Sequence, residues 1–378
     1  MLWGCLIVIS ILITNFHPIS GGGHATYIKS LVCDTPDDLS IEVASPATSL
    51  VFSFCAQNMV TCHPVNFPGK LKELLMILRN LIKLRRLVLT KSFDIIHCNG
   101  SPDHRLAMLT LLTVRGASKP KVLFTKHNSF PVQNSIFTKW RYISHTDSVI
   151  TVCSEQEKQI QTVLSGKTPI RTISNGVCLT RFRPVPSKRK AELRSQFEIP
   201  HDRLVFVSCA GSSIHKGWQY LAKVAAHDAS ILVIVLGNKP PQNKLEEIFA
   251  GEIPNNLWFP GNQDDVRPYL WAADVGFVLS TSVETISFAC REMMATGLPA
   301  LVSDVGCLAQ NVDQGSGWVV IPGSSSSIGE VLPIIKRANL EKMQIAARQR
   351  AERLFDVQTF RNQTYNVYRN LAPTRPRD

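Results

Sequence analysis

Two carboxylates in this sequence stand at a spacing that suits a long phosphorylated ligand. Glu284 and Glu292 are eight residues apart within Ser282 to Asp304, which reads SVETISFACREMMATGLPALVSD. The segment predicts a helix that ends at Gly297, with Pro299 as a stop. Eight helical residues span about 12 Å, which is close to the distance from the sugar to the ribose of a nucleoside diphosphate sugar. Two unrelated glutamates on an amphipathic surface helix would give the same spacing.

The start of this helix is a candidate anion site. The amides of Thr285, Ile286 and Ser287 would have no acceptor inside the helix, and the helix dipole places partial positive charge beside them. A pyrophosphate lying over these amides would leave its sugar and its ribose near the two glutamates.

A glycine loop near the N-terminus is a second candidate for close contact with a ligand. Gly21, Gly22 and Gly23 follow the first predicted strand and precede a helix that starts at His24. Glycine lets a backbone approach a phosphate or a sugar closely. A dinucleotide-binding fingerprint would need glycine at the third position of G-x-G-x-x-G, where this chain has Thr26.

Short apolar, β-branched runs alternate with longer amphipathic stretches, which indicates βα units around parallel sheets. In the first half the predicted strands are 6–13, 41–43, 51–54, 95–97, 122–125, 148–152 and 171–173, and the predicted helices are 24–32, 71–90, 102–114 and 154–164. In the second half the predicted strands are 205–208, 231–236, 257–259, 275–279 and 300–303. Between them, Arg181 to Lys190 is rich in proline and basic residues and predicts a linker.

The predicted fold class is α/β, with two Rossmann-like doubly wound domains that face a central cleft with the carboxyl ends of their strands. We predict an N-terminal domain at 1–183, a C-terminal domain at 184–354, and a helix at 355–378 that packs back on the N-terminal domain. Asn175 and Gly176, just before the linker, suit a tight turn with positive φ.

The positive charge of the chain lies entirely in its first half. Residues 1–190 hold 23 Lys and Arg against 10 Asp and Glu, a net charge of +13, whereas residues 191–378 hold 18 against 19, a net charge of −1. Lys70 to Lys91 alone carries seven cations and one acid among leucine and isoleucine. This stretch predicts contact with an anionic membrane, and a helix packed on the core with a solvated basic face is the alternative. Nucleic acid is not expected, because no aromatic-rich or helix-turn-helix pattern accompanies the charge.

The N-terminus and the cysteines bear on location and cofactors. Met1 to Thr14 has no Lys or Arg before its apolar run and no small-residue cleavage site, so we interpret it as a buried first strand, with a signal peptide or anchor as the alternative. No other run of 18 apolar residues exists, so no helix is expected to span a bilayer. We therefore predict a cytoplasmic protein that contacts the cytoplasmic face of the inner membrane peripherally. The ten cysteines are scattered singly, and no metal site is expected.

The glutamate segment and its continuation GLPALVSDVG resemble the glutamate, seven residues, glutamate signature of the retaining glycosyltransferases of family 4, which have the GT-B fold and serve lipopolysaccharide and capsule biosynthesis. Four further segments resemble motifs of that family in the expected order, and the resemblance covers about residues 6 to 370. They are Phe93 to Gly100 (FDIIHCNG), Lys126 to Asn128, Ile173 to Pro184 (ISNGVCLTRFRP) and Ala210 to Trp218 (AGSSIHKGW).

The resemblance implies roles for the second-domain residues. Glu292 would bind the ribose hydroxyls and Glu284 the hydroxyls of the donor sugar, over the amides of 285–287. Lys216 would hold the diphosphate and stabilise the negative charge that builds as it departs, although a Lys-Gly pair by itself is usually structural. The family's arginine in that loop is replaced by Gly211 or Ser212, and its glycines after the first glutamate are also replaced.

The resemblance also implies roles for the first domain, which would bind the acceptor. It places a histidine at the reaction centre, and His127 and His97 are the candidates, although a single histidine at a strand end is also common as a structural residue. It places the loop with Gly22 and Gly23 near the donor diphosphate and the acceptor.

The implied activity is transfer of a hexose from a nucleoside diphosphate sugar to a growing glycan or lipid-linked acceptor. The resemblance further implies retention of configuration, with no cofactor and no metal. Two alternatives remain open. A nucleotide-sugar epimerase would need a pair of acid/base carboxylates, and none is evident; a non-catalytic relative that acts as a binding partner would account for the replaced arginine and glycines.

Overall fold

The computed structural model describes residues 8–19, 22–115, 119–164 and 166–373. Contacts divide these residues into two units. Unit 1 holds the described residues up to Ser174 and those from Phe360 onward, and unit 2 runs from Asn175 to Thr359. Residues 175–183, which the sequence analysis assigned to the first domain, lie in unit 2.

Unit 1 is built on a seven-stranded parallel sheet in the order β3-β2-β1-β4-β5-β6-β7. The order reverses between β1 and β4, so the chain leaves the centre of the sheet in both directions from this pair. The central strand β1 is apolar and fully buried at Ile11, Leu12 and Ile13, as a strand covered on both faces must be. The strands are β1 (Ile9–Thr14), β2 (Leu39–Ser45), β3 (Cys62–Pro64), β4 (Ile95–Cys98), β5 (Lys121–Lys126), β6 (Ser148–Thr151) and β7 (Ile170–Thr172).

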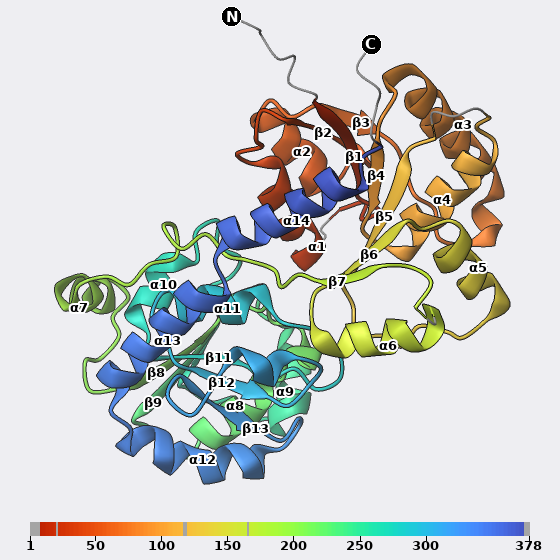
Figure 1. Ribbon diagram of the computed structural model, residues 1–378. Coiled ribbons are helices and arrows are strands. Elements are labelled where there is room, and N and C mark those ends of the chain that lie inside the picture. The colour runs from red at the N-terminus through yellow and green to blue at the C-terminus, as the bar shows by residue number, and fades with distance from the viewer. Residues whose placement is uncertain (1–7, 20–21, 116–118, 165, 374–378) are drawn as a thin grey trace, which may run out of the picture. The chain divides into compact units, whose positions relative to one another are not determined.

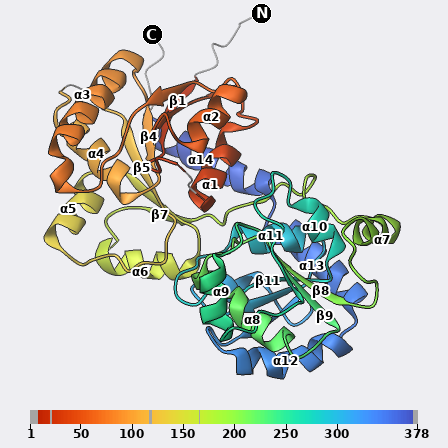
Figure 2. The same ribbon diagram turned by 180° about the vertical axis from the view of Figure 1, so that it is seen from behind.

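Helices lie on both faces of this sheet (Figures 1 and 2). On one face, apolar side chains of α3, α4 and α6 pack against those of the strands. The helices are α1 (Gly22–Val32), α2 (Leu50–Gln57), α3 (Leu74–Lys91, preceded by the 3₁₀ turn Leu71–Glu73), α4 (Ser101–Leu112), α5 (Ile136–Ser144), α6 (Ser154–Leu164) and α14 (Val357–Leu371).

One predicted strand of this unit is wrong. The run at 51–54 belongs to helix α2, because Ser49 caps the helix and its Oγ accepts a hydrogen bond from the Phe52 amide at 3.0 Å. The true neighbour of β2 is the short β3, which the sequence analysis did not predict. Residues 1–7 of the predicted first strand region lie outside the described residues.

The segment of α14 from Phe360 onward completes unit 1. Phe360 and Tyr365 are buried, and the Tyr365 hydroxyl donates to the Leu31 carbonyl at 2.9 Å. Arg361 donates to Asp34 at 2.9 Å. The chain therefore contributes to unit 1 both before and after it forms unit 2.

Unit 2 is built on a six-stranded parallel sheet in the order β10-β9-β8-β11-β12-β13. Helices α8, α9 and α12 pack on one apolar face of this sheet and α7, α10, α11 and α13 on the other. The strands are β8 (Leu204–Ser208), β9 (Ile231–Val235), β10 (Leu257–Trp258), β11 (Val275–Val278), β12 (Ala300–Ser303) and β13 (Gly317–Val320). The helices are α7 (Ser187–Gln196), α8 (Trp218–Ala225), α9 (Gln242–Phe249), α10 (Arg267–Ala272), α11 (Phe288–Ala295), α12 (Ser325–Arg337) and α13 (Leu340–Leu354). The predicted doubly wound α/β class is confirmed in each unit.

The predicted linker is only partly a linker. Helix α7 begins inside it at Ser187, and Arg194 of that helix holds Asp274 at 2.6 Å. Gly176 does not have the positive φ expected for it. It is needed for a close approach instead, because a Cβ there would lie 2.4 Å from the Val357 Cα.

None of the helices in the described ranges combines the length and the apolar character that crossing a membrane requires.

Candidate functional site

In unit 2, two of the residues singled out in the sequence, Lys216 and Glu284, lie side by side where the strand order reverses. Lys216 lies in the loop after β8 and Glu284 in the loop after β11, and these two strands are neighbours at the reversal point. The Lys216 Nζ lies 2.8 Å from the Glu284 Oε2, although the residues are 68 positions apart. Open α/β sheets bind ligands at the carboxyl ends of strands at such a point.

The Lys-Gly step explains how the two loops approach one another. Gly217 has φ +74°, and a Cβ there would lie 1.8 Å from the Leu279 carbonyl oxygen at the end of β11. The His215 carbonyl accepts a hydrogen bond from the Thr281 amide at 2.9 Å. Glycine is therefore required beside Lys216 both for its conformation and for the space that it leaves.

The Glu284 carboxylate is held on several sides. Its Oε2 also accepts from the Ser280 hydroxyl at 3.0 Å, and its Oε1 accepts from the Thr285 amide at 3.2 Å. Gly306, from the loop after β12, packs on the Glu284 backbone, since a Cβ there would lie 2.1 Å from its carbonyl oxygen. These contacts fix a carboxylate beside an ammonium group at the strand ends.

The helix that was expected near Glu284 starts later. Helix α11 begins at Phe288, and Ser287 is its N-cap, with φ +49° and with Oγ accepting from the Cys290 amide. Ile286 is buried, and its carbonyl accepts from Asn311 at 2.8 Å. The expectation that 285–287 are the first helical amides is therefore wrong, because these residues form a turn that is tied to the loop at Asn311.

Glu292 lies on α11, and Gly297, with φ +90°, ends that helix as predicted. Burial raises the pKa of Glu292 to about 7, and the positive charge of Arg181 opposes this rise. The Cys209 thiol is 3.9 Å from its Oε2. Arg181 had been assigned to the linker, so sequence reasoning missed a cation near this glutamate.

In unit 1, His127 lies at the carboxyl end of β5, where the structure brings it beside residues from β4 and α1. Its Nε2 is 3.0 Å from the Asn99 Oδ1, and its ring is 4.5 Å from the rings of both His24 and Tyr27. Burial lowers the pKa of His127 well below its usual range, and the neighbouring histidines add to this effect. The imidazole is therefore neutral at pH 7.

His97 occupies a different environment from His127. It has no exposed surface, and its Nδ1 and Nε2 each lie 2.7 Å from a hydroxyl, those of Tyr368 and Thr125. Burial lowers its pKa to about 3. With both ring nitrogens occupied inside the unit, the geometry favours a structural role for His97 and leaves His127 as the histidine that lines a cavity.

The glycine loop lies near these histidines. Gly22 and Gly23 form the exposed start of α1, with Gly22 at φ +45°, and Gly21 lies outside the described residues. The His24 ring is 4.8 Å from that of His17. Burial, with the charge of His17, lowers the pKa of His24 to about 3.

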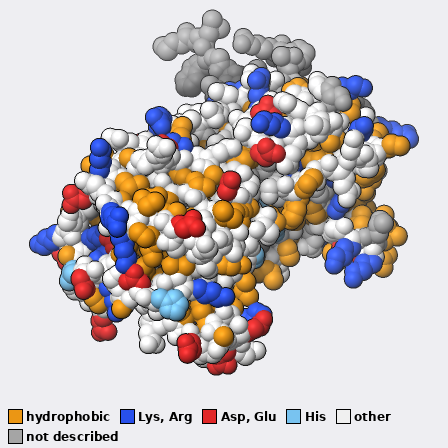
Figure 3. Space-filling view, turned by 90° about the horizontal axis from the view of Figure 1, so that it is seen from below, with side chains coloured by type: hydrophobic (Ala, Val, Ile, Leu, Met, Phe, Trp, Pro, Cys, Tyr) orange, Lys and Arg blue, Asp and Glu red, His pale blue; other side chains and the backbone are white. Residues whose placement is uncertain are grey.

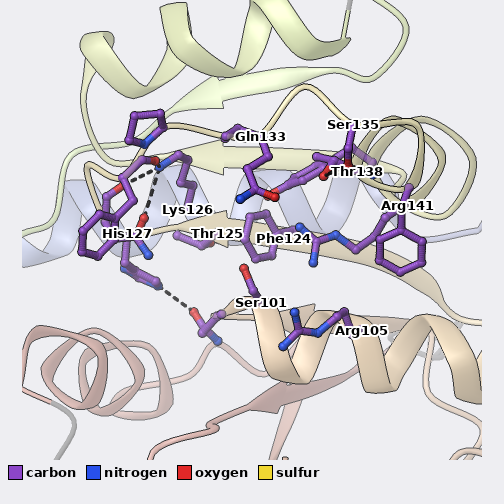
Figure 4. Close-up of a pocket in the computed structure, with 18 residues that line it drawn as sticks. Ser101, Arg105, Phe124, Thr125, Lys126, His127, Gln133, Ser135, Thr138 and Arg141 are labelled. Carbon is purple, nitrogen blue, oxygen red and sulfur yellow. Dashed lines mark hydrogen bonds between the residues drawn. The ribbon is translucent and has the colours of Figure 1, made fainter. Parts of the chain in front are cut away.

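Two arginines of unit 1 were missed by sequence reasoning. Arg105 and Arg141 line the same cavity as His127 (Figure 4). No local motif marks them, because they are brought together only by the packing of α4 and α5. Within the described ranges no three His, Cys, Asp or Glu side chains are grouped so that they could hold a metal ion.

Several solved structures share the fold of this chain. The chain superposes on a glycosyltransferase from Rickettsia africae with a TM-score of 0.82 and 16% identity, over 96% of this chain and 98% of that one. It superposes on HepE from Anabaena in complex with UDP with a TM-score of 0.79 and 18% identity, over 96% of this chain and 100% of that one. At these identities the likeness concerns the fold.

Curated bacterial relatives match part of the chain. The O-antigen biosynthesis glycosyltransferase WclY of Escherichia coli is 24% identical over 241 residues, which is 59% of this chain and 65% of that protein. An Escherichia coli UDP-Gal:alpha-D-GlcNAc-diphosphoundecaprenol alpha-1,3-galactosyltransferase is 26% identical over 262 residues, which is 62% of this chain and 64% of that protein. The chain thus matches slightly less than two thirds of the length of these relatives.

Two family models divide the chain between them. Residues 21–181 match the model described as Glycosyltransferase Family 4, and residues 189–351 match the model described as Glycosyl transferases group 1. Together with the two Rossmann-like units, these matches establish that the chain belongs to the glycosyltransferases of GT-B fold.

Proposed function

We propose that this protein transfers a sugar from a nucleoside diphosphate sugar to a growing glycan or lipid-linked acceptor in lipopolysaccharide or capsule synthesis. The observation that carries the proposal is the pairing of Lys216 and Glu284 at the strand reversal of unit 2, at 2.8 Å. A fixed ammonium group beside a fixed carboxylate suits a ligand that has a phosphate next to sugar hydroxyls.

Each donor residue has one task in this proposal. Lys216 stabilises the negative charge that develops on the diphosphate as the bond to the sugar breaks, a task that a metal cation performs in other enzymes. Glu284 accepts hydrogen bonds from the sugar hydroxyls and also orients Lys216. Glu292 accepts hydrogen bonds from the ribose hydroxyls and must be ionised to do so at full strength.

The acceptor side of the proposal rests on unit 1 and on the relatives. The name of one relative specifies UDP-galactose as donor and a diphosphoundecaprenol as acceptor, so we propose a nucleotide sugar and a lipid-linked glycan here as well. His127 is the histidine that we assign to the reaction centre. Transfer of a hexose with retention of configuration, in which the departing phosphate oxygen takes the acceptor proton, completes the proposal.

Helix α3 supports peripheral contact with an anionic membrane. It buries only Asn80, Leu84 and Val88, and six of its apolar side chains are at least 44% exposed. Basic residues that make no ion pair among the described side chains alternate with them. Figure 3 shows one face of the molecule, on which Lys and Arg side chains lie beside apolar side chains in several places. The exposed apolar residues are Leu74, Leu75, Met76, Leu78, Ile82 and Leu89, and the basic ones are Arg79, Lys83, Arg85 and Arg86, with Lys72 in the 3₁₀ turn before the helix.

The donor is tested by measuring the melting temperature of the purified protein with UDP, GDP, ADP and CMP and their common sugars. A ligand at a hundredfold excess over its Kd stabilises the native state by about 2.7 kcal/mol. We expect a shift with one nucleotide, reduced in Glu292→Ala and kept in Glu330→Ala, an exposed glutamate of the same unit. Product formation with that donor then tests transfer. No shift with any nucleotide would favour a non-catalytic relative.

A further inference from the structure

A cavity of about 370 Å³ lies entirely within unit 1, between α4, α5 and the carboxyl end of β5. We name it the α4–α5 pocket. Its polar lining includes Ser101, Arg105, Lys126, His127, Thr138 and Arg141. Figure 4 shows the Arg105 side chain entering from α4 and the Arg141 side chain from α5, both toward the space beside Ser101 and Phe124.

Arg141 is the central feature of this pocket. Its side chain is only 7% exposed, and its Nε has no hydrogen-bond partner. In the part of the chain that the structure describes, no carboxylate forms an ion pair with it. A buried guanidinium without a counter-ion is costly, so a group of this kind points to an anion that the pocket receives.

The other cations of the pocket add to its positive charge. The pKa of Arg105 is lowered, first by burial and then by the charge of Arg141, which indicates that the two guanidinium groups repel one another. Lys126 is 4% exposed, and its ammonium group donates to the carbonyls of Asn128 and Phe130 rather than to a carboxylate. The N-terminus of α4 also opens here through Gly100 and Ser101.

The charges of the pocket's cations are only partly offset by an acid, Asp103, whose charge raises the pKa of Arg105. No Asp or Glu is among the described residues that line the pocket. Asp103, two residues after Ser101 in α4, is fully buried and accepts hydrogen bonds from the Thr14 hydroxyl and, at 2.7 Å, from the Asn99 amide. Burial raises its pKa to about 6, so its negative charge is incomplete in mildly acidic solution.

We propose that the α4–α5 pocket binds a phosphate group of the acceptor, with the guanidinium groups of Arg141 and Arg105 as its ligands. Two guanidinium forks that reach one space from different helices suit the several oxygens of a phosphate, which carries up to two charges. Phe130 and Phe137 also line the pocket and are 57% and 49% exposed. An apolar chain attached to the phosphate would therefore find contacts at the rim.

This inference rests on the proposed function only in assigning the phosphate to the acceptor. The phosphate could belong to a lipid diphosphate or to a soluble sugar phosphate, and the test separates these sources. Isothermal titration uses three probes: inorganic pyrophosphate, farnesyl diphosphate and glucose 1-phosphate. All titrations use the full chain carrying Lys216→Gln, so that the donor-side lysine does not contribute.

We expect at least one probe to bind, and Arg141→Gln to weaken that binding about ten- to a hundredfold, as the loss of a charge-assisted hydrogen bond implies. Arg105→Gln should weaken binding to a similar degree, and it is the test variant if Arg141→Gln does not fold. Lys158→Gln, an exposed cation on α6 of the same unit, should bind like the parent. Tighter binding of farnesyl diphosphate than of pyrophosphate identifies a lipid source, and preference for glucose 1-phosphate a soluble one.

The proposal is overturned if none of the probes binds, or if binding is unchanged in the folded arginine variants. Its failure differs from failure of the proposed function, because nucleotide binding by unit 2 is measured separately with Lys216 intact. If a nucleotide sugar raises the melting temperature but none of these anions binds, the proposed function stands and only the phosphate subsite is refuted.

Discussion

Lys216 and Glu284 form an ion pair of 2.8 Å that joins the loops after two neighbouring strands, β8 and β11. The side chains are 23% and 13% exposed, so solvent reaches both of them only in part. The pair is held by backbone contacts on both loops, through Gly217 and through Gly306. The position of the ion pair is therefore fixed by the backbones of two loops that follow neighbouring strands of unit 2.

Neutral substitutions in this pair should reduce transfer much more than they reduce stability. We expect Lys216→Gln and Glu284→Gln to lower kcat by a hundredfold or more, which is typical when a group that stabilises transition-state charge is removed. The free energy of unfolding should change by about 1 kcal/mol or less for a partly exposed pair. Turnover with the identified donor and thermal melts measure the two effects. Lys244→Gln breaks an exposed pair with Glu247 in the same unit and should leave both quantities unchanged.

Ser287 should tolerate glycine better than alanine. It adopts φ +49° and ψ 107°, a conformation that costs a residue with a Cβ on the order of 1 kcal/mol or more. Glycine removes that cost and is nearly as good an N-cap as serine, whereas alanine keeps the cost and loses the cap. We expect Ser287→Gly to raise the melting temperature and Ser287→Ala to lower it. Equal destabilisation by both substitutions would contradict this account of the turn.

Glu292 should make unit 2 less stable as pH rises. Its pKa is raised to about 7 in the native state, so the native state binds a proton between pH 4.5 and 7 that the unfolded state has released. Stability from this residue is therefore lost as pH rises through that window, and the loss persists above pH 7. Melts of the wild type and of Glu292→Gln from pH 5 to pH 8.5 test this. The stability of the variant relative to the wild type should increase across the window, and a constant difference would refute the assignment.

The two histidines of unit 1 should respond differently to alanine. His97→Ala removes hydrogen bonds to Tyr368 and Thr125 in a fully buried site, so we expect a loss of about 3 kcal/mol in unfolding free energy. His127→Ala should cost less stability and should abolish most transfer. Denaturant unfolding and initial rates separate the two effects, with His227→Ala, an exposed histidine, as the control. Full activity in His127→Ala would remove it from the reaction centre.

Binding to acidic vesicles should depend on α3. We expect the protein to sediment with vesicles that contain phosphatidylglycerol and not with pure phosphatidylcholine, and to be released by salt. Each basic residue near such a surface contributes about 1 kcal/mol, so the double variant Arg85→Gln, Arg86→Gln should bind roughly 25-fold more weakly. Lys158→Gln on α6 should have no effect. Binding that ignores both acidic lipid and salt would rule out this surface.

Much of the fold could be predicted because parallel strands covered on both faces are continuous apolar runs. Strand β12 and helix α6 have the predicted bounds, and most other strands differ by one or two residues. The run at 51–54 could not be assigned in this way, since its valine and phenylalanines suit a strand and only the cap at Ser49 decides for a helix. Helix α5 was missed because three of its apolar side chains face outward and obscure its periodicity, as Ile136 does at 89% exposure.

The candidate site was less predictable than the fold. The spacing of Glu284 and Glu292 does not reveal that the helix starts only at Phe288, because the turn before it depends on Asn311, from a later part of the chain. Arg105 and Arg141 carry no sequence signal at all. Arg105 looks like an ordinary surface arginine on a predicted helix, and Arg141 lies where no helix was predicted, so only the packing of α4 and α5 reveals that Arg141 is buried.

The hydrogen bond between His97 and Tyr368 also constrains the order in which the protein can fold during synthesis. The ribosome releases the β-strands of unit 1 first, then the whole of unit 2, and only afterwards the part of α14 that covers the first sheet. Unit 2 can fold while translation continues, whereas unit 1 remains incomplete, with Tyr27 and His97 uncovered, until α14 has been synthesised. Nascent chains halted before residue 360 should accordingly need chaperones more than chains that have passed it.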